Sequence, residues 1–151
     1  MAGRCWKLPK EPTDRERDKE AAPDQAREQG LRMAVVTNAM RLNANAMLAA
    51  VGVTDYFDTI VIGEECPNGK PHPDPYRIAM EALGANPEAS VAFEDSLSGL
   101  QSARASGAYT IGVRSSLDAT ALSAAGAHAT ISDFTDPSLQ AHLQRAIGAA
   151  A

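Results

Sequence analysis

The sequence predicts an α/β fold, in which a parallel sheet carries helices on both faces. Short apolar stretches alternate along the chain with longer stretches whose apolar residues recur at helical spacing. The short stretches are apolar throughout, as is typical of parallel strands that are buried on both faces. Together these observations predict a three-layer, Rossmann-like arrangement.

The first predicted strand is MAVVT (33–37), and apolar residues at helical spacing then predict a helix that ends at Gly52. The second strand is TIVIG (59–63). Asp74-Pro75 predicts a helix start, since aspartate caps helices and proline suits their first turn, and Gly84 ends this helix. The remaining predicted elements are, in order, the strand SVAF (90–93), a helix over 96–106, the strand YTIGV (109–113), a helix over 116–125, the strand HATI (128–131) and a helix that Asp136-Pro137 opens.

Three segments are expected along the chain. Residues 1–23 are interpreted as a charged, flexible tail, because they mix basic and acidic side chains with too few apolar residues to bury. Residues 24–147 are expected to form the folded core, and residues 148–151 a short alanine-rich tail.

Charge and composition exclude several classes of function. The net charge of -5 argues against binding to nucleic acid, which requires a clustered basic face. No apolar run approaches the length of a membrane span, so no membrane partner is expected. The two cysteines, Cys5 and Cys66, suggest neither a disulfide framework nor a zinc site. We therefore expect a reducing, cytoplasmic location and leave a chloroplast location open.

Polar side chains follow three of the predicted strands. The first strand ends in Thr37-Asn38, the second leads into a loop that contains Lys70, and the third ends in Glu94-Asp95. Functional groups of such folds gather at the carboxyl ends of the strands, so these residues are expected to face one edge of the sheet. A hydroxyl, backbone amides, one ammonium and two carboxylates would suit a phosphoryl group and Mg²⁺.

Each of these residues also has an ordinary structural explanation. Thr37 and Asn38 could cap the following helix, Asp95 could cap the helix after its strand, and Lys70 could be a surface lysine. Other polar residues lack the spacing of a metal or catalytic site and are interpreted as solvated or structural: His72, His128, His142, Glu64 and Glu65.

Three stretches then resemble a known family. VVTN (35–38), GKPHPDPY (69–76) and VAFEDSLSGLQSARASG (91–107) are similar to the second, third and fourth motifs of the haloacid dehalogenase superfamily of Mg²⁺-dependent phosphohydrolases. Within it, the sequence resembles the branch of sugar phosphatases and β-phosphoglucomutase-like proteins. The resemblance covers about residues 25–143.

The resemblance implies a role for each strand-end residue. Thr37 and Asn38 would bind phosphoryl oxygens, and Lys70 would neutralise the phosphate and an attacking carboxylate, which makes Thr37 and Lys70 the catalytic candidates. Asp95 would coordinate Mg²⁺, with Glu94 as a second or water-mediated ligand. The implied partner is a small phosphorylated metabolite.

The sequence departs from the family at its first motif, an Asp-x-Asp that ends a central strand and supplies the nucleophile. No such pair precedes Thr37, so no nucleophile is assigned in this chain, and the substrate-selecting cap is missing too. We expect the central first strand to be missing as well, because residues 1–30 lack an apolar run of sufficient length.

This departure leaves two hypotheses for the function. In the first, the chain is the carboxyl-terminal portion of a phosphohydrolase, and this portion is inactive alone. The alternative is a non-catalytic phosphate- or Mg²⁺-binding module, or one that pairs with another chain that supplies the missing strand. A phosphoacceptor domain of the response-regulator kind is disfavoured, because its acidic residues precede the threonine and here they follow it.

Overall fold

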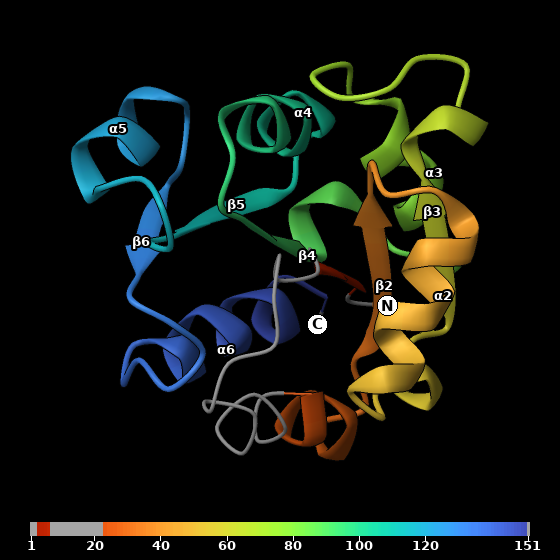
Figure 1. The fold of residues 1–151 in the computed structure, drawn as a ribbon. Helices are drawn as coiled ribbons and strands as arrows, with labels where there is room; N and C mark the ends of the chain where they lie inside the picture. The colour runs from red at the N-terminus through yellow and green to blue at the C-terminus, as the bar shows by residue number, and fades with distance from the viewer. Residues whose placement is uncertain (1–2, 7–22, 151) are drawn as a thin grey trace.

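The computed structural model describes residues 3–6 and 23–150, and in them six strands form one parallel sheet (Figure 1). The order across the sheet is β3-β2-β1-β4-β5-β6, which is the order of doubly wound folds that change direction beside a central first strand. The strands are β1 Gly3–Trp6, β2 Arg32–Thr37, β3 Thr59–Ile62, β4 Ser90–Glu94, β5 Tyr109–Val113 and β6 Ala129–Ile131.

Helices connect most of these strands, as the alternation in the sequence predicts. A helical segment over residues 23–28 precedes β2. The labelled helices are α2 Arg41–Ala50, α3 Asp74–Leu83, α4 Leu97–Ser106, α5 Ala119–Ala124 and α6 Leu139–Ala150, and short 3₁₀ turns cover Thr54–Tyr56, Gly63–Glu65 and Pro87–Ala89. The prediction of an α/β parallel sheet with helices on both faces is therefore confirmed.

The prediction that the central strand is missing is wrong. Gly3–Trp6 lies between β2 and β4 and pairs with both in parallel, with Cys5 opposite Ala34 on one side and Ala92 on the other. A strand in this place is held by backbone hydrogen bonds to both neighbours, so four residues suffice without the apolar run that we required. These residues therefore belong to the core and not to a tail, whereas 1–2 and 7–22 lie outside the described residues.

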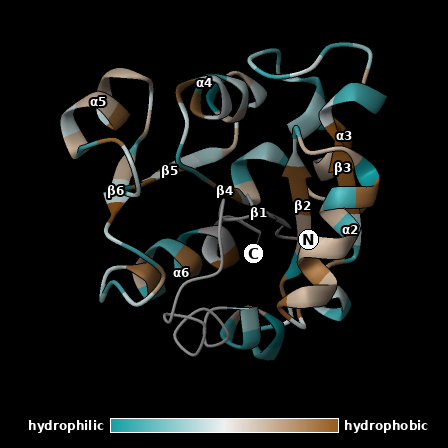
Figure 2. Ribbon diagram, in the orientation of Figure 1, coloured by the Kyte–Doolittle hydropathy of each residue, from teal (hydrophilic) through white to brown (hydrophobic). Residues whose placement is uncertain are grey.

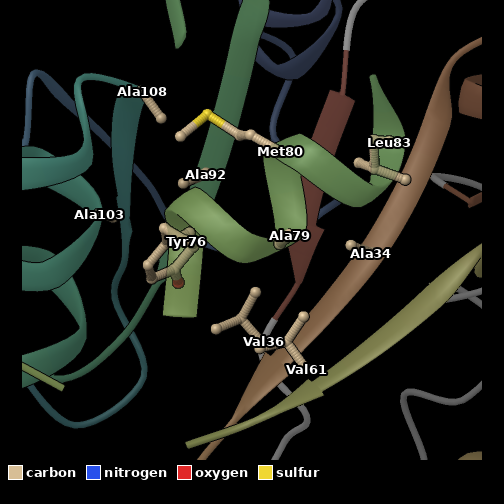
Figure 3. Packing of buried hydrophobic residues seen from close by; sticks show 10 residues of the cluster. All are labelled: Ala34, Val36, Val61, Tyr76, Ala79, Met80, Leu83, Ala92, Ala103 and Ala108. Carbon is tan, nitrogen blue, oxygen red and sulfur yellow. The ribbon is translucent and has the colours of Figure 1, made fainter. Parts of the chain in front are cut away.

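The two faces of the sheet bury different side chains because successive strand residues point to opposite sides. On one face, Met33 and Phe93 pack with Leu143 of α6. On the other face, α3 and α4 cover β2 and β4 (Figure 3). Figure 2 shows the matching pattern: β2 is coloured hydrophobic, whereas the helices carry both hydrophobic and hydrophilic stretches.

Helix ends follow the sequence closely in places and depart from it in others. α3 and α4 end at Gly84 and Gly107, whose positive φ angles of 61° and 92° are readily adopted by glycine. α6 continues to Ala150, so the last helix includes residues that the sequence analysis assigned to a short alanine-rich tail. Within the described ranges, no helix has the length and apolar character needed to cross a bilayer.

Candidate functional site

The predicted site residues lie around the central strand of the sheet. Thr37 is the last residue of β2 and Glu94 the last residue of β4, and β1 lies between these two strands. Trp6, the last residue of β1, pairs with Val35, so β1 ends two residues short of Thr37. Here the connections leave the central strand toward opposite sides, which is where doubly wound folds bind ligands.

Lys70 joins the two strands that flank β1. Its ammonium donates a hydrogen bond to the carbonyl oxygen of Val36 in β2 at 3.1 Å and forms an ion pair with Glu94 in β4. Its side chain is only 3% exposed, so Lys70 is not the surface lysine that we considered as an alternative. A lysine ammonium has three N–H bonds, and the described residues provide these two acceptors.

Glu94 is fully buried and surrounded by donors. Its Oε1 accepts hydrogen bonds from Lys70 and from the Tyr76 hydroxyl, the latter at 2.5 Å, and its Oε2 lies 3.5 Å from Ser96 Oγ. A buried carboxylate needs such donors to replace the hydrogen bonds that it would make with water. Both oxygens of Glu94 therefore have donors within the folded chain.

Gly99, in the first turn of α4, leaves the space that this carboxylate fills. A Cβ atom built at Gly99 would lie 2.1 Å from Oε2 of Glu94 and 2.5 Å from Oε1. The absence of a side chain at Gly99 therefore lets the start of α4 lie against the Glu94 carboxylate.

Asp95 is directly after β4 and is partly exposed. Its Oδ2 accepts a hydrogen bond of 3.1 Å from the Ser115 hydroxyl, which follows β5. The cap of α4 is Ser96, whose Oγ accepts a hydrogen bond from the Gly99 amide at 3.2 Å. Asp95 is therefore not the helix cap that we considered, and its carboxylate contacts the segment after β5.

Thr37 and Asn38 differ in their exposure. Thr37 is buried, and its Oγ1 accepts a hydrogen bond from the Ala39 amide at 3.0 Å, whereas Asn38 is exposed. The residue that caps α2 is Met40, which makes no side-chain capping bond, so neither Thr37 nor Asn38 caps that helix. Asn38 lies instead against Gly63, where a Cβ atom would come within 2.4 Å of its Oδ1.

A surface ion pair fixes the loop after β3 beside the start of α2. Arg41 donates to Glu65 through Nε at 2.7 Å and through Nη2 at 2.5 Å, and both side chains are about half exposed. The Arg41 hydrogen bond lowers the pKa of Glu65, and the same bond raises the pKa of Arg41. Burial, followed by the nearby Asp74, raises the pKa of the Cys66 thiol, which keeps this cysteine protonated.

Two carboxylates at the edge of the sheet, Asp95 and Glu94, would suit Mg²⁺. Among the described residues, no group of three or more His, Cys, Asp and Glu side chains could hold a metal ion. Mg²⁺ usually keeps several waters and takes one or two carboxylates together with substrate phosphate. The pair Asp95 and Glu94 fits that donor set, with Asp95 the more accessible carboxylate.

Sequence reasoning missed two neighbours of the candidate site residues, the Tyr76 hydroxyl and the Ser115 hydroxyl. Tyr76 lies among the apolar residues of α3 and is fully buried. The signal was its polar tip, because a buried tyrosine hydroxyl usually has a hydrogen-bond partner. For Ser115 the sequence carries no comparable signal, since its partner Asp95 is 20 residues away.

Comparison with known proteins identifies similar chains. The family described as haloacid dehalogenase-like hydrolase matches residues 20–113. The protein CbbY of Rhodobacter capsulatus is 45% identical over 87 residues, which are 56% of this chain and 38% of that protein. The phosphorylated carbohydrates phosphatase of Thermotoga maritima is 39% identical over 103 residues, which are 67% of this chain and 48% of that enzyme.

The fold also matches solved structures. A haloacid dehalogenase family hydrolase from Deinococcus radiodurans, crystallised with bound phosphate and sodium, superimposes with a TM-score of 0.72 at 28% identity. The match covers 87% of this chain and 59% of that one. The chain thus spans less than half the length of the two curated relatives described above.

Proposed function

Because the chain belongs to the haloacid dehalogenase-like hydrolase family, we propose that its strand-end residues form the phosphate and Mg²⁺ site of a phosphohydrolase that acts on small phosphate monoesters. The single observation that carries this proposal is the position of Lys70. A buried ammonium lies at the carboxyl edge of the sheet, held by Val36 and Glu94, and these two acceptors, the ones that residues 3–6 and 23–150 provide, leave one of its three N–H bonds for an incoming anion.

We assign phosphate binding to Lys70, Thr37 and Asn38. The buried ammonium of Lys70 would stabilise phosphate oxygens through a charge-assisted hydrogen bond, which is stronger than one between neutral groups. Thr37 Oγ1 already accepts from the Ala39 amide, so its own O–H is available to donate to a phosphoryl oxygen. The Asn38 amide is exposed beside it and would donate to the same group.

We assign Mg²⁺ binding to Asp95, with Glu94 as a second or water-mediated ligand. The cation would neutralise the phosphate and polarise its P–O bonds when bound. Asp95 is already oriented by the Ser115 hydroxyl, as ligating carboxylates commonly are by neighbouring hydrogen bonds.

Relatives with phosphorylated substrates support the choice of substrate class. One is a phosphorylated carbohydrates phosphatase, and another, from Escherichia coli, is a fructose-1-phosphate phosphatase. A CbbY crystal structure contains phosphate. Sugar phosphates are therefore the substrates that we would test first, in the cytoplasmic setting that the sequence suggests.

We further propose that this chain binds phosphate and Mg²⁺ without hydrolysing esters. β1 consists of Gly-Arg-Cys-Trp, and Lys-Leu-Pro-Lys follows it in the sequence, so the acidic pair that the family resemblance implies does not end this strand. Without a carboxylate to attack phosphorus, no phosphoenzyme can form through the family's route.

A non-catalytic binding module is therefore the second candidate function, and the observation that favours it is the same sequence of β1. Pairing with another chain that fills the centre of the sheet is no longer part of this candidate, because β1 occupies that place.

Calorimetry on the purified chain tests the proposal, with inorganic phosphate and MgCl₂ titrated separately and together. We expect phosphate binding that Lys70→Met abolishes and Mg²⁺ binding that Asp95→Asn abolishes. Incubation with glucose 6-phosphate and an aryl phosphate should release no phosphate. Hydrolysis of either ester by the native chain, lost in Asp95→Asn, would refute the claim that the chain is inactive. Failure of the native chain to bind phosphate or Mg²⁺ would refute the proposed site.

A further inference from the structure

Tyr76 is the buried aromatic residue that links helix α3 to the candidate site. Its side chain is 0% exposed, and its hydroxyl donates to Glu94 Oε1 at 2.5 Å. The Lys70 ammonium lies 5.2 Å from the centre of the Tyr76 ring, so the same residue borders both members of the buried ion pair. Figure 3 shows Tyr76 between α3 and α4, with its hydroxyl oxygen at the end of the ring.

The hydroxyl is not needed for packing. Tyr76 belongs to the apolar stripe of α3 with Ala79, Met80 and Leu83, and phenylalanine would fill the same volume without a polar atom to satisfy. A tyrosine at this buried position therefore indicates that the hydrogen bond of its hydroxyl has a role of its own. That partner is the carboxylate that holds Lys70.

We propose that Tyr76 is a positioning residue, whose hydroxyl fixes the Glu94 carboxylate so that the Lys70 ammonium stays at the phosphate position between β2 and β4. The importance of that position rests on the proposed function. The Glu94 carboxylate fills the space beside Gly99, and its Oε1 accepts the hydrogen bond from the Tyr76 hydroxyl. Without the hydroxyl, the carboxylate loses a donor that restrains it, and the ammonium loses a fixed partner.

The arrangement also divides the two carboxylates between two tasks. Oε1 of Glu94 accepts from both Lys70 and Tyr76, so this oxygen is committed to holding the ammonium. Asp95, which is partly exposed and oriented by Ser115, then carries the greater share of Mg²⁺ binding. Loss of the Tyr76 hydroxyl is accordingly expected to affect the phosphate more than the cation.

The test compares Tyr76→Phe with the native chain and with Met80→Val, a matched control one turn further along the buried face of α3. The first readout is the rate at which an amine-reactive acylating reagent, added in limiting amount, modifies Lys70. Peptide mass spectrometry measures the acylated fraction of each lysine over time. The chain contains three other lysines, Lys7, Lys10 and Lys19, which serve as internal references. We expect Tyr76→Phe to accelerate acylation of Lys70 about tenfold, the size of effect expected for loss of one charge-assisted hydrogen bond.

The second readout is binding of inorganic phosphate and of Mg²⁺ by calorimetry. Tyr76→Phe should weaken phosphate binding about tenfold and Mg²⁺ binding less than twofold, since the affected group is the ammonium. The unfolding temperature of each variant is measured in the same buffer. A merely structural effect would change Lys70 reactivity in proportion to the loss of stability in both variants.

The outcomes separate this proposal from the proposed function. Equal acylation rates of Lys70 in Tyr76→Phe and Met80→Val, at equal loss of stability, would overturn the positioning role. An equal loss of affinity for phosphate and for Mg²⁺ in Tyr76→Phe would overturn it too. If the native chain binds neither ion, the proposed function fails, while the acylation rate of Lys70 still decides whether Tyr76 restrains the ammonium.

Discussion

The carboxylate of Glu94 occupies the position where any residue other than glycine at position 99 would place its first side-chain carbon. The distance from that position to the nearer carboxylate oxygen would be 2.1 Å, far below a van der Waals contact. Glu94 cannot simply turn away, because Lys70 and Tyr76 both donate to its Oε1. The start of α4 and the charged centre of the site are therefore fitted to each other.

Gly99→Ala should therefore lower the free energy of unfolding by about 2–3 kcal/mol, because it displaces a buried, paired carboxylate. Chemical denaturation measures this. Gly148→Ala is the matched control, since Gly148 is also helical and a Cβ atom there would have no neighbour within 4 Å. Helix propensity predicts a change between zero and a gain of about 1 kcal/mol for the control. If Gly99→Ala unfolds with the same free energy as the native chain, the Glu94 carboxylate does not need the space that Gly99 leaves.

Glu94→Ala should lower the free energy of unfolding by about 3–5 kcal/mol, because it leaves the Lys70 ammonium buried without its counter-charge. The double variant Lys70→Met with Glu94→Ala should lose less than the sum of the two single variants, because the two residues interact directly. The same denaturation series gives all three values.

The surface pair Arg41 and Glu65 provides the control for this experiment. Both side chains are about half exposed, so Arg41→Ala should change the free energy of unfolding by less than about 1 kcal/mol despite the short contacts. Two results would show that burial does not set the strength of the ion pair between Lys70 and Glu94. One is a double variant whose loss in free energy of unfolding equals the sum of the single losses, and the other is a loss in Arg41→Ala as large as that in Glu94→Ala.

Gly63→Ala is expected to weaken phosphate binding and leave stability nearly unchanged. A Cβ atom at this residue would approach Asn38 Oδ1 to 2.4 Å, and the exposed amide can move away at little energetic cost. Its new position would no longer serve the phosphate that we assign to it. Gly69→Ala is the control, because its Cβ atom would make only an ordinary contact at 3.5 Å. Unchanged phosphate affinity in Gly63→Ala would remove Asn38 from the site.

Mild acid should destabilise the end of the molecule that contains β6 and α6. His128 Nδ1 accepts a hydrogen bond of 2.9 Å from the Thr110 amide, which requires that nitrogen to be unprotonated, and the ring stacks on Tyr109. Burial, followed by the positive charge of Arg104, lowers the pKa of His128 below its ordinary value of 6.5. Burial likewise lowers the pKa of His142, which packs against the same tyrosine.

A pKa that is lower in the folded state means that the unfolded chain binds protons first. The stability from neutral His128 is thus complete above pH 6.5 and is lost as the pH falls through the lower folded value. Asp136 does not titrate in this range, because hydrogen bonds from Ser138 and Ser132 lower its pKa to about 2. Thermal unfolding between pH 7.5 and 5 measures the effect. His128→Asn should flatten the profile, and a profile as steep as that of the native chain would contradict this explanation.

The sequence located much of the candidate site. Thr37 and Glu94 end the strands that were predicted to end there, and Lys70 contacts Glu94 although 24 residues separate them. That success has a simple physical cause: apolar runs mark strands locally, and parallel strands bring their carboxyl ends to one edge. The assigned roles of these residues, unlike their positions, stay predictions until the binding experiments are done.

The sequence failed where the outcome depends on contacts between distant segments. Gly3–Trp6 has no apolar periodicity, so its place in the centre of the sheet could not be predicted from local pattern. The same holds for the Tyr76 hydroxyl, whose apolar neighbours in α3 made it look like an ordinary core residue. In both instances a backbone or a polar group finds its partner only after the sheet has assembled.

By itself the sequence determined the alternation of strands and helices and the polar residues with which the strands end, because both depend on local periodicity and on which residues can follow a buried strand. Only the tertiary structure decided that β1 completes the sheet, that Lys70 is buried between Val36 and Glu94, and that Gly99 leaves the space for that carboxylate. Hydrogen bonds across strands, ion pairs and steric exclusion join residues far apart in the chain, so they are settled only when those residues are brought together.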